Sequence, residues 1–165
     1  MISYTDQLAA LNASLHLVGL GKIPTIPDSI AHRVVLHNNL PFPAYWTVLS
    51  KAMGIIPTFA HEKYFLDRAS SNVATSVISG TPLIAKEELF RQYSYITPEM
   101  MWLQQENESE IDTWLRVLAM GKEKWHEKKQ IILRRRGELM VENRDNVAEY
   151  LQEVRSRMRQ RVKYS

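Results

Sequence analysis

Our prediction of the fold starts from one stretch of the chain, Ala69-Ser70-Ser71-Asn72-Val73-Ala74-Thr75-Ser76-Val77-Ile78-Ser79-Gly80-Thr81-Pro82-Leu83-Ile84-Ala85. Its small polar beginning predicts a helix, because the hydroxyls of Ser70 and Ser71 can accept hydrogen bonds from backbone N–H groups of the first turn. Gly80 can adopt the left-handed conformation that ends a helix, and Pro82 prevents its continuation. The apolar residues that follow predict a short buried strand. A helix that begins with such small side chains can hold an anion, typically a phosphate, at its positive end.

Apolar strand-like segments and helical segments alternate on both sides of this stretch. We expect strands over residues 15–21, 33–37, 54–59 and 82–85, with residues 93–97 as a further one. Near-continuous apolar strands are typical of a parallel sheet that is covered on both faces. The pattern therefore predicts an α/β fold, a three-layer Rossmann-like domain with a parallel sheet of about five strands, and ligands bind such sheets at the carboxyl ends of the strands.

The C-terminal part of the chain has a different charge balance from the rest. Residues 122–165 hold 13 Lys and Arg against 7 Asp and Glu, whereas residues 1–121 hold 8 against 11. We predict that residues 1–121 form the Rossmann-like domain and that residues 122–165 form a basic, mixed-charge helical extension of two helices, 122–142 and 146–161. Mixed charges of this kind usually mark a solvated face, and few aromatic residues accompany them, so we expect no nucleic-acid partner.

Composition excludes several other functions. The chain has no cysteine, which excludes disulfides and thiolate chemistry, and its five histidines lack the spacing of metal ligands. Serines do not occur in the Gly-x-Ser-x-Gly pattern of esterases. No apolar run has the length of a transmembrane segment, and the first residues do not resemble a signal peptide. We therefore expect a cytoplasmic protein with no transmembrane segment and no metal.

Five segments in a fixed order resemble a known family. They are Leu17-Val18-Gly19-Leu20-Gly21, the strand at 33–37, Leu40-Pro41-Phe42-Pro43-Ala44-Tyr45-Trp46-Thr47-Val48-Leu49-Ser50-Lys51-Ala52, Ile55-Ile56-Pro57 and residues 69–85. Over residues 8–120 this order is similar to the C-terminal, nucleotide-sugar-binding half of the GT-B fold glycosyltransferases of families 1 and 4. The resemblance implies that the chain binds a nucleotide-diphosphate sugar as substrate, without a metal or another cofactor.

The resemblance also implies which residues contact the donor. Asn38 and Asn39 would lie against the base, while Ser70, Ser71 and Asn72 would meet the diphosphate with Arg68 nearby. Thr75 stands where many relatives place a glutamate that binds the ribose. The bare local sequence also allows a simpler interpretation, in which the three polar residues only cap a core helix.

The family's N-terminal acceptor domain is absent from this chain. We therefore expect a donor-binding half that acts as a glycosyltransferase, a hexosyltransferase, only together with an acceptor-domain partner chain, and we assign no catalytic residue. The alternative is a non-catalytic, truncated protein-interaction module. Such a module would bind a partner chain through an unpaired sheet edge and through its basic helices.

Overall fold

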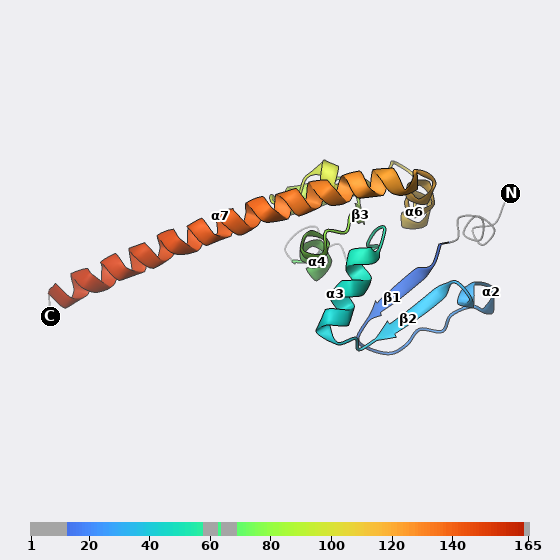
Figure 1. Ribbon diagram of the computed structural model, residues 1–165, viewed down its shortest axis with the longest axis horizontal. Helices are drawn as coiled ribbons and strands as arrows, with labels where there is room; N and C mark the ends of the chain where they lie inside the picture. The colour runs from blue at the N-terminus through green and yellow to red at the C-terminus, as the bar shows by residue number, and fades with distance from the viewer. Residues whose placement is uncertain (1–12, 58–62, 64–68, 164–165) are drawn as a thin grey trace.

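The computed structural model describes residues 13–57, 63 and 69–163, and helices make up 58% of the structure. Figure 1 shows a compact part from which one long helix extends. The described elements are β1 (Leu15–Gly19), α2 (Asp28–Ala31), β2 (Val34–Asn38), α3 (Phe42–Lys51), α4 (Ser71–Ser79), β3 (Leu83–Ala85), α5 (Leu89–Gln92), the 3-10 helix η2 (Pro98–Met100), β4 (Met101–Leu103), α6 (Glu110–Ala119) and α7 (Gly121–Lys163).

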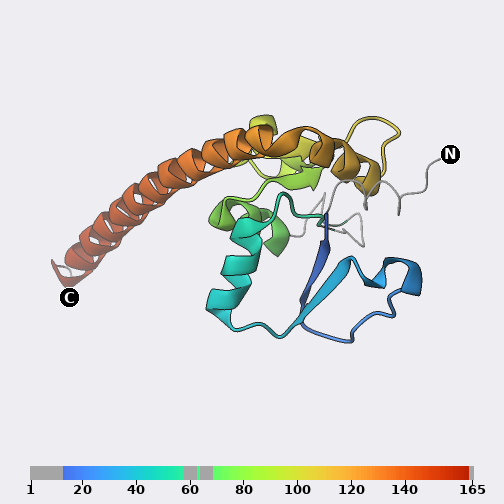
Figure 2. The same cartoon turned by 45° about the vertical axis from the view of Figure 1, so that its right-hand side comes forward.

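The strands form two separate parallel pairs. In the first, β1 pairs with β2 in a register that runs from Leu15 opposite Val34 to Gly19 opposite Asn38. In the second, β3 pairs with β4, with Leu83 opposite Met101 and Ala85 opposite Leu103. Figure 2 shows β1 and β2 as a pair separate from the β3–β4 pair, which lies beside α7.

The prediction of a three-layer Rossmann-like domain with about five parallel strands is wrong, since the described residues hold two short two-stranded sheets. Two features of the chain explain the difference. Ile55 makes a single parallel bridge to Leu83, and Pro57, two residues later, has no N–H with which to extend a ladder. Val35 and Leu36 of β2 remain 40% and 42% exposed, so this sheet is not covered on both faces.

One other predicted strand is also wrong. Residues 93–97 form a turn between α5 and η2, in which the Ile96 N–H donates to the Tyr93 carbonyl over 3.1 Å. The strand follows instead at β4 (Met101–Leu103), a segment that we did not predict to be a strand. Short apolar runs suit a strand or a packed turn equally well, so the pattern alone does not separate the two.

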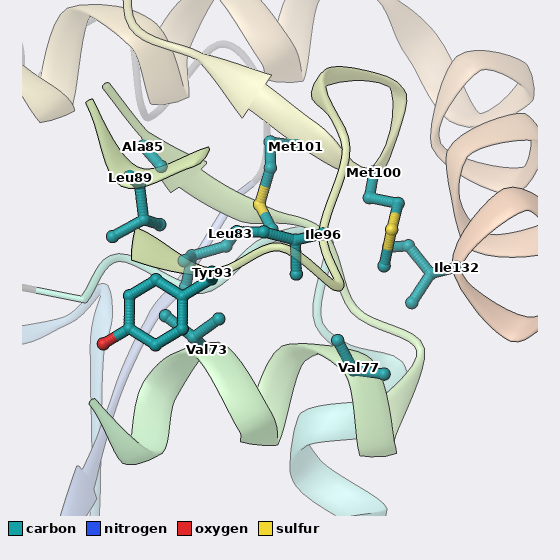
Figure 3. Packing of buried hydrophobic residues seen from close by; sticks show 10 residues of the cluster. All are labelled: Val73, Val77, Leu83, Ala85, Leu89, Tyr93, Ile96, Met100, Met101 and Ile132. Atoms are coloured by element: carbon teal, nitrogen blue, oxygen red, sulfur yellow. The ribbon is translucent and has the colours of Figure 1, made fainter. Parts of the chain in front are cut away.

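The core lies between α4, the β3–β4 pair and the first third of α7. Its buried cluster is shown in Figure 3 and consists of Val73, Val77, Leu83, Ala85, Leu89, Tyr93, Ile96, Met100, Met101 and Ile132. Nine of its ten residues lie between positions 73 and 101, and the tenth is Ile132 of α7. Ile132 of α7 lies beside Met100 and is fully buried, so the long helix is anchored in the same core that α4 covers.

The helix predicted from residues 69–85 is confirmed at both ends. Ser70 is its N-cap, and the Ser70 hydroxyl accepts a hydrogen bond from the Asn72 N–H over 3.2 Å. Gly80 follows the last turn with φ of 72°. A Cβ atom at Gly80 would lie only 2.6 Å from Cδ2 of Leu133, so this glycine both ends α4 and lets α7 pass close by.

The C-terminal segment is one continuous helix of 43 residues; the two predicted helices with a break near residues 143–145 are wrong. Asn143-Arg144-Asp145-Asn146 contains neither proline nor glycine, and without such a breaker a helix that is already nucleated continues. Its N-terminal third is held to the compact part, since Trp125 Nε1 donates to the Ala52 carbonyl over 3.1 Å and Lys128 Nζ to the Glu99 carbonyl over 2.9 Å.

The apolar content of the helices bears on one further prediction. Among residues 13–57, 63 and 69–163, no helix is both long enough and apolar enough to cross a membrane. α7 has the length, but charged residues occur throughout it.

Candidate functional site

Two of the residues predicted to bind phosphate at the start of α4, Ser70 and Asn72, form hydrogen bonds within the protein. The Ser70 hydroxyl caps the Asn72 N–H, and the Ser70 N–H donates to the Tyr93 hydroxyl over 2.7 Å. Asn72 Nδ2 donates to the Pro57 carbonyl over 3.0 Å. These bonds give Ser70 and Asn72 a structural role, which is the simpler interpretation that the local sequence allowed.

The other predicted donor-binding residues of this segment differ in accessibility. Ser70 and Thr75 are buried, with exposed fractions of 6% and 8%. Ser71 is exposed at the first position of the helix. Arg68, predicted to lie near the phosphates, falls outside the described residues. Of the predicted phosphate-binding set, Ser71 is therefore the described residue most open to a ligand.

The residues predicted to flank the base, Asn38 and Asn39, lie at the end of β2 in the β1–β2 sheet. Asn38 ends β2 opposite Gly19, and the Asn39 N–H donates to the Gly19 carbonyl over 3.1 Å. Asn39 has a φ of 54°, a left-handed conformation that asparagine tolerates well. α4 packs instead on α3, β3 and α7, and no hydrogen bond within the described part of the chain joins the two groups of predicted site residues.

A pair of histidines on β1 and β2 was missed at the sequence level. His16 Nδ1 and His37 Nε2 lie 2.8 Å apart, and Ser14 Oγ lies 3.0 Å from His16 Nε2. Burial, with the neighbouring His37 as a second cause, lowers the pKa of His16 below its usual value. Every second residue of a strand points to the same face of the sheet, so residues 16 and 18 of β1 share a face with residues 35 and 37 of β2. This two-residue period could have indicated that the two histidines lie together. Across the described residues no group of three potential metal ligands occurs.

A network of charged and polar side chains lies at the C-terminal end of β4. Arg116 Nε and Nη2 donate to the two carboxylate oxygens of Glu108 over 2.7 and 2.8 Å, and Nη2 also donates to the Leu103 carbonyl. Thr113 adds a hydroxyl bond to the same carboxylate over 2.9 Å. These bonds lower the pKa of Glu108 to about 2, with the Arg116 hydrogen bond as the largest cause. The network ties α6 to the sheet, and its polar groups are used within the fold.

The distal part of α7 exposes several large apolar side chains. Every residue from Met140 to Arg159 is exposed except Val154, which is half-buried. Apolar side chains recur there after steps of seven, four, three and four residues, which keeps them on one side of the helix. We call this set the distal stripe, and it consists of Met140, Val147, Leu151, Val154 and Met158.

The spacing of the distal stripe is that of a coiled-coil seam. Met140, Val147 and Val154 are seven residues apart, and Leu151 and Met158 form a second series with the same period. Two apolar positions per seven residues make a narrow seam along one side of a helix. Arg144 occupies the position of the second series between Gly137 and Leu151, so one charged residue interrupts an otherwise apolar seam.

Charge changes sign along the same part of α7. Residues 138–153 carry five acids and one base, Arg144, whereas residues 154–163 carry four arginines and one lysine and no acid. Within the helix, Arg135 pairs with Glu138 and Glu142, and Arg157 with Glu153. Exposed pairs of this kind contribute little to stability. The end of the helix is therefore strongly basic and its middle is acidic.

Comparisons of the chain with protein-family models, with curated proteins and with solved structures gave no match. The resemblance to the GT-B glycosyltransferases thus stays an interpretation of the sequence pattern.

Proposed function

We propose that this protein is a non-catalytic interaction module whose distal stripe packs against an amphipathic helix of a partner as a two-stranded coiled coil. The observation that supports the proposal is the seven-residue apolar repeat on an exposed helical segment. Met140, Val147 and Met158 are 67%, 57% and 64% exposed. A soluble helix normally turns such a repeat toward a core or toward another helix.

The geometry of α7 suits an extended contact. A helix rises 1.5 Å per residue, so the stripe from Met140 to Met158 is about 27 Å long. This length corresponds to nearly three heptads, and each of its apolar side chains loses water when a second helix covers it. Because the root of α7 is fixed by Ile132 in the core, the stripe is presented on an ordered helix rather than on a loose tail.

The first test places a photoreactive amino acid in the stripe. We expect a photoreactive residue at Val147 to cross-link a polypeptide in the cells that produce the protein, with the reacted peptide carrying apolar residues at heptad spacing. Glu149 is exposed on the opposite side of the helix and is the matched control position. Equal yields from positions 147 and 149, or no product from either, would contradict the proposal.

A second test changes the seam without changing the rest of the fold. Leu151→Glu together with Met158→Glu puts two charges into the stripe, and Gln152→Glu together with Ser156→Glu adds the same charges outside it. All four positions are exposed, so both double variants should unfold at nearly the same temperature as the wild type. We expect the first variant alone to lose the cross-link from position 147. Equal cross-linking by both variants would show that the stripe is not the contact surface.

A further inference from the structure

We infer that the partner of the distal stripe is a second copy of this chain, bound antiparallel. The inference rests on the proposed function, since it names the occupant of the same surface. Its basis is the way in which the seam of α7 complements itself when one copy is reversed, and in particular the position of Arg144.

A parallel arrangement of two copies is unfavourable at two places. In register, it would set Arg144 against Arg144 of the second copy inside an apolar seam, where two like charges lose water and repel each other. It would also bring together two basic ends, each with four arginines and one lysine over residues 154–163. Like charges placed side by side within a Debye length of about 10 Å oppose association.

The antiparallel arrangement removes both conflicts. In antiparallel coiled coils the two seam series face each other, so Met140 lies opposite Met158 of the second copy and Val147 opposite Leu151. Arg144 then lies opposite Val154, where a single long side chain can extend its charged group to water. The seam consequently has four apolar layers and two layers that combine one arginine with one valine.

The charges outside the seam favour the same direction. In the reversed copy the basic end of α7 runs beside the segment that carries Glu138 and Glu142. Both glutamates pair with Arg135 of their own helix but are at least half exposed, so they can also act on a neighbouring helix. Gly137 adds room at this end, because nothing lies within 4 Å of the position of an added Cβ atom.

The test uses the full chain, which has no cysteine, so introduced thiols give unambiguous cross-links. We expect sedimentation velocity to show a concentration-dependent dimer. We expect Met140→Cys mixed with Met158→Cys to form an intermolecular disulfide on mild oxidation. Met158→Cys alone should not, because residues 158 of the two copies would be about 27 Å apart along the paired helices.

A change at Arg144 gives an independent measure. Arg144→Leu should tighten the dimer at least tenfold by removing the charge from the seam, whereas Arg159→Leu, at an exposed position outside the seam, should change the dissociation constant less than threefold. A tightening by the control equal to that by Arg144→Leu would overturn the register.

The remaining outcomes separate this inference from the proposed function. Disulfide formation by Met158→Cys alone would show a parallel pair and overturn the inference. A monomer at all concentrations, together with a cross-link from position 147 to a different polypeptide, would overturn the inference and leave the proposed function supported. A monomer without any cross-link from position 147 would overturn both.

Discussion

Gly80 joins two parts of the molecule that are far apart in the sequence. It ends α4 in the left-handed conformation and lies against Leu133 of α7. A side chain there meets two obstacles, since L-residues are strained at this φ and the Cβ atom would come within 2.6 Å of the leucine. The same small residue thus satisfies the local and the tertiary requirement.

We expect Gly80→Ala to destabilise the fold by roughly 1–2 kcal/mol from the left-handed backbone alone, with a further cost from the contact with Leu133. Urea unfolding followed by circular dichroism measures the change. Gly137→Ala is the matched control, because Gly137 lies inside a helix with open space around it; we expect it to stabilise the fold by about 0.5–1 kcal/mol. A neutral Gly80→Ala would contradict the left-handed conformation assigned to this residue.

Glu108 links pH to stability. Its pKa is about 2 in the folded chain, below the usual value of 4.5, so the folded state binds the proton less well than the unfolded state. The stabilisation is complete above pH 4.5 and is lost as the pH falls through 2. Glu108→Gln should lower the free energy of unfolding at pH 7, with the deficit shrinking between pH 4.5 and 2. A deficit that does not change over this range would contradict the assigned role of the Arg116 pair.

The helix α4 could be predicted from its own residues because its signals are local. Ser70 and Gly80 determine where it begins and ends through backbone geometry within one turn, and the structure confirms both. The pairing of strands depends on residues far apart in the chain. Nothing in Leu83-Ile84-Ala85 itself says that its neighbours are Ile55 and Met101 rather than Leu17 or Val35, and the five-stranded sheet was wrong for this reason.

The site was predictable to a smaller extent than the fold. Ser70 was identified as a cap, which the structure confirms, and as a phosphate ligand, which stays a prediction. The hydrogen bond from its N–H to the Tyr93 hydroxyl could not be foreseen from the local residues. The distal stripe was present in the sequence as the seven-residue spacing of Met140, Val147 and Val154. It was missed because an assumed break near residue 143 divided the repeat between two helices.

The start of α4 is also where donor binding can be tested. Because Ser70 and Asn72 already bond within the protein, we expect millimolar UDP, GDP and their sugars to leave the melting temperature unchanged within 1 °C, whereas a donor present at 100 times its Kd would add about 2.7 kcal/mol. A clear rise that Ser71→Glu abolishes would support the nucleotide-sugar function. Gln152→Glu, at an exposed position of α7, controls for the added charge.

The compact part and the long helix depend on one core. Ile132 is fully buried among residues of α4, β3 and η2, so the root of α7 is part of the folding unit. We expect Ile132→Ala to cost about 2–5 kcal/mol, the usual range for a buried isoleucine. Met140→Ala, at a side chain that is 67% exposed, should change the stability of a dilute sample by less than 1 kcal/mol. Thermal unfolding followed at 222 nm compares the two, and similar losses would mean that the core does not extend into α7.

The unbroken course of α7 has a mechanical consequence. From Ile132 to Met158 the helix covers about 39 Å, so a tilt of roughly 5° at the root displaces the far end by about 3 Å. A small rearrangement around Gly80 and Leu133 would therefore produce a larger displacement at the C-terminal end of α7. Conversely, a force that acts on this end would be transmitted along the helix to the core.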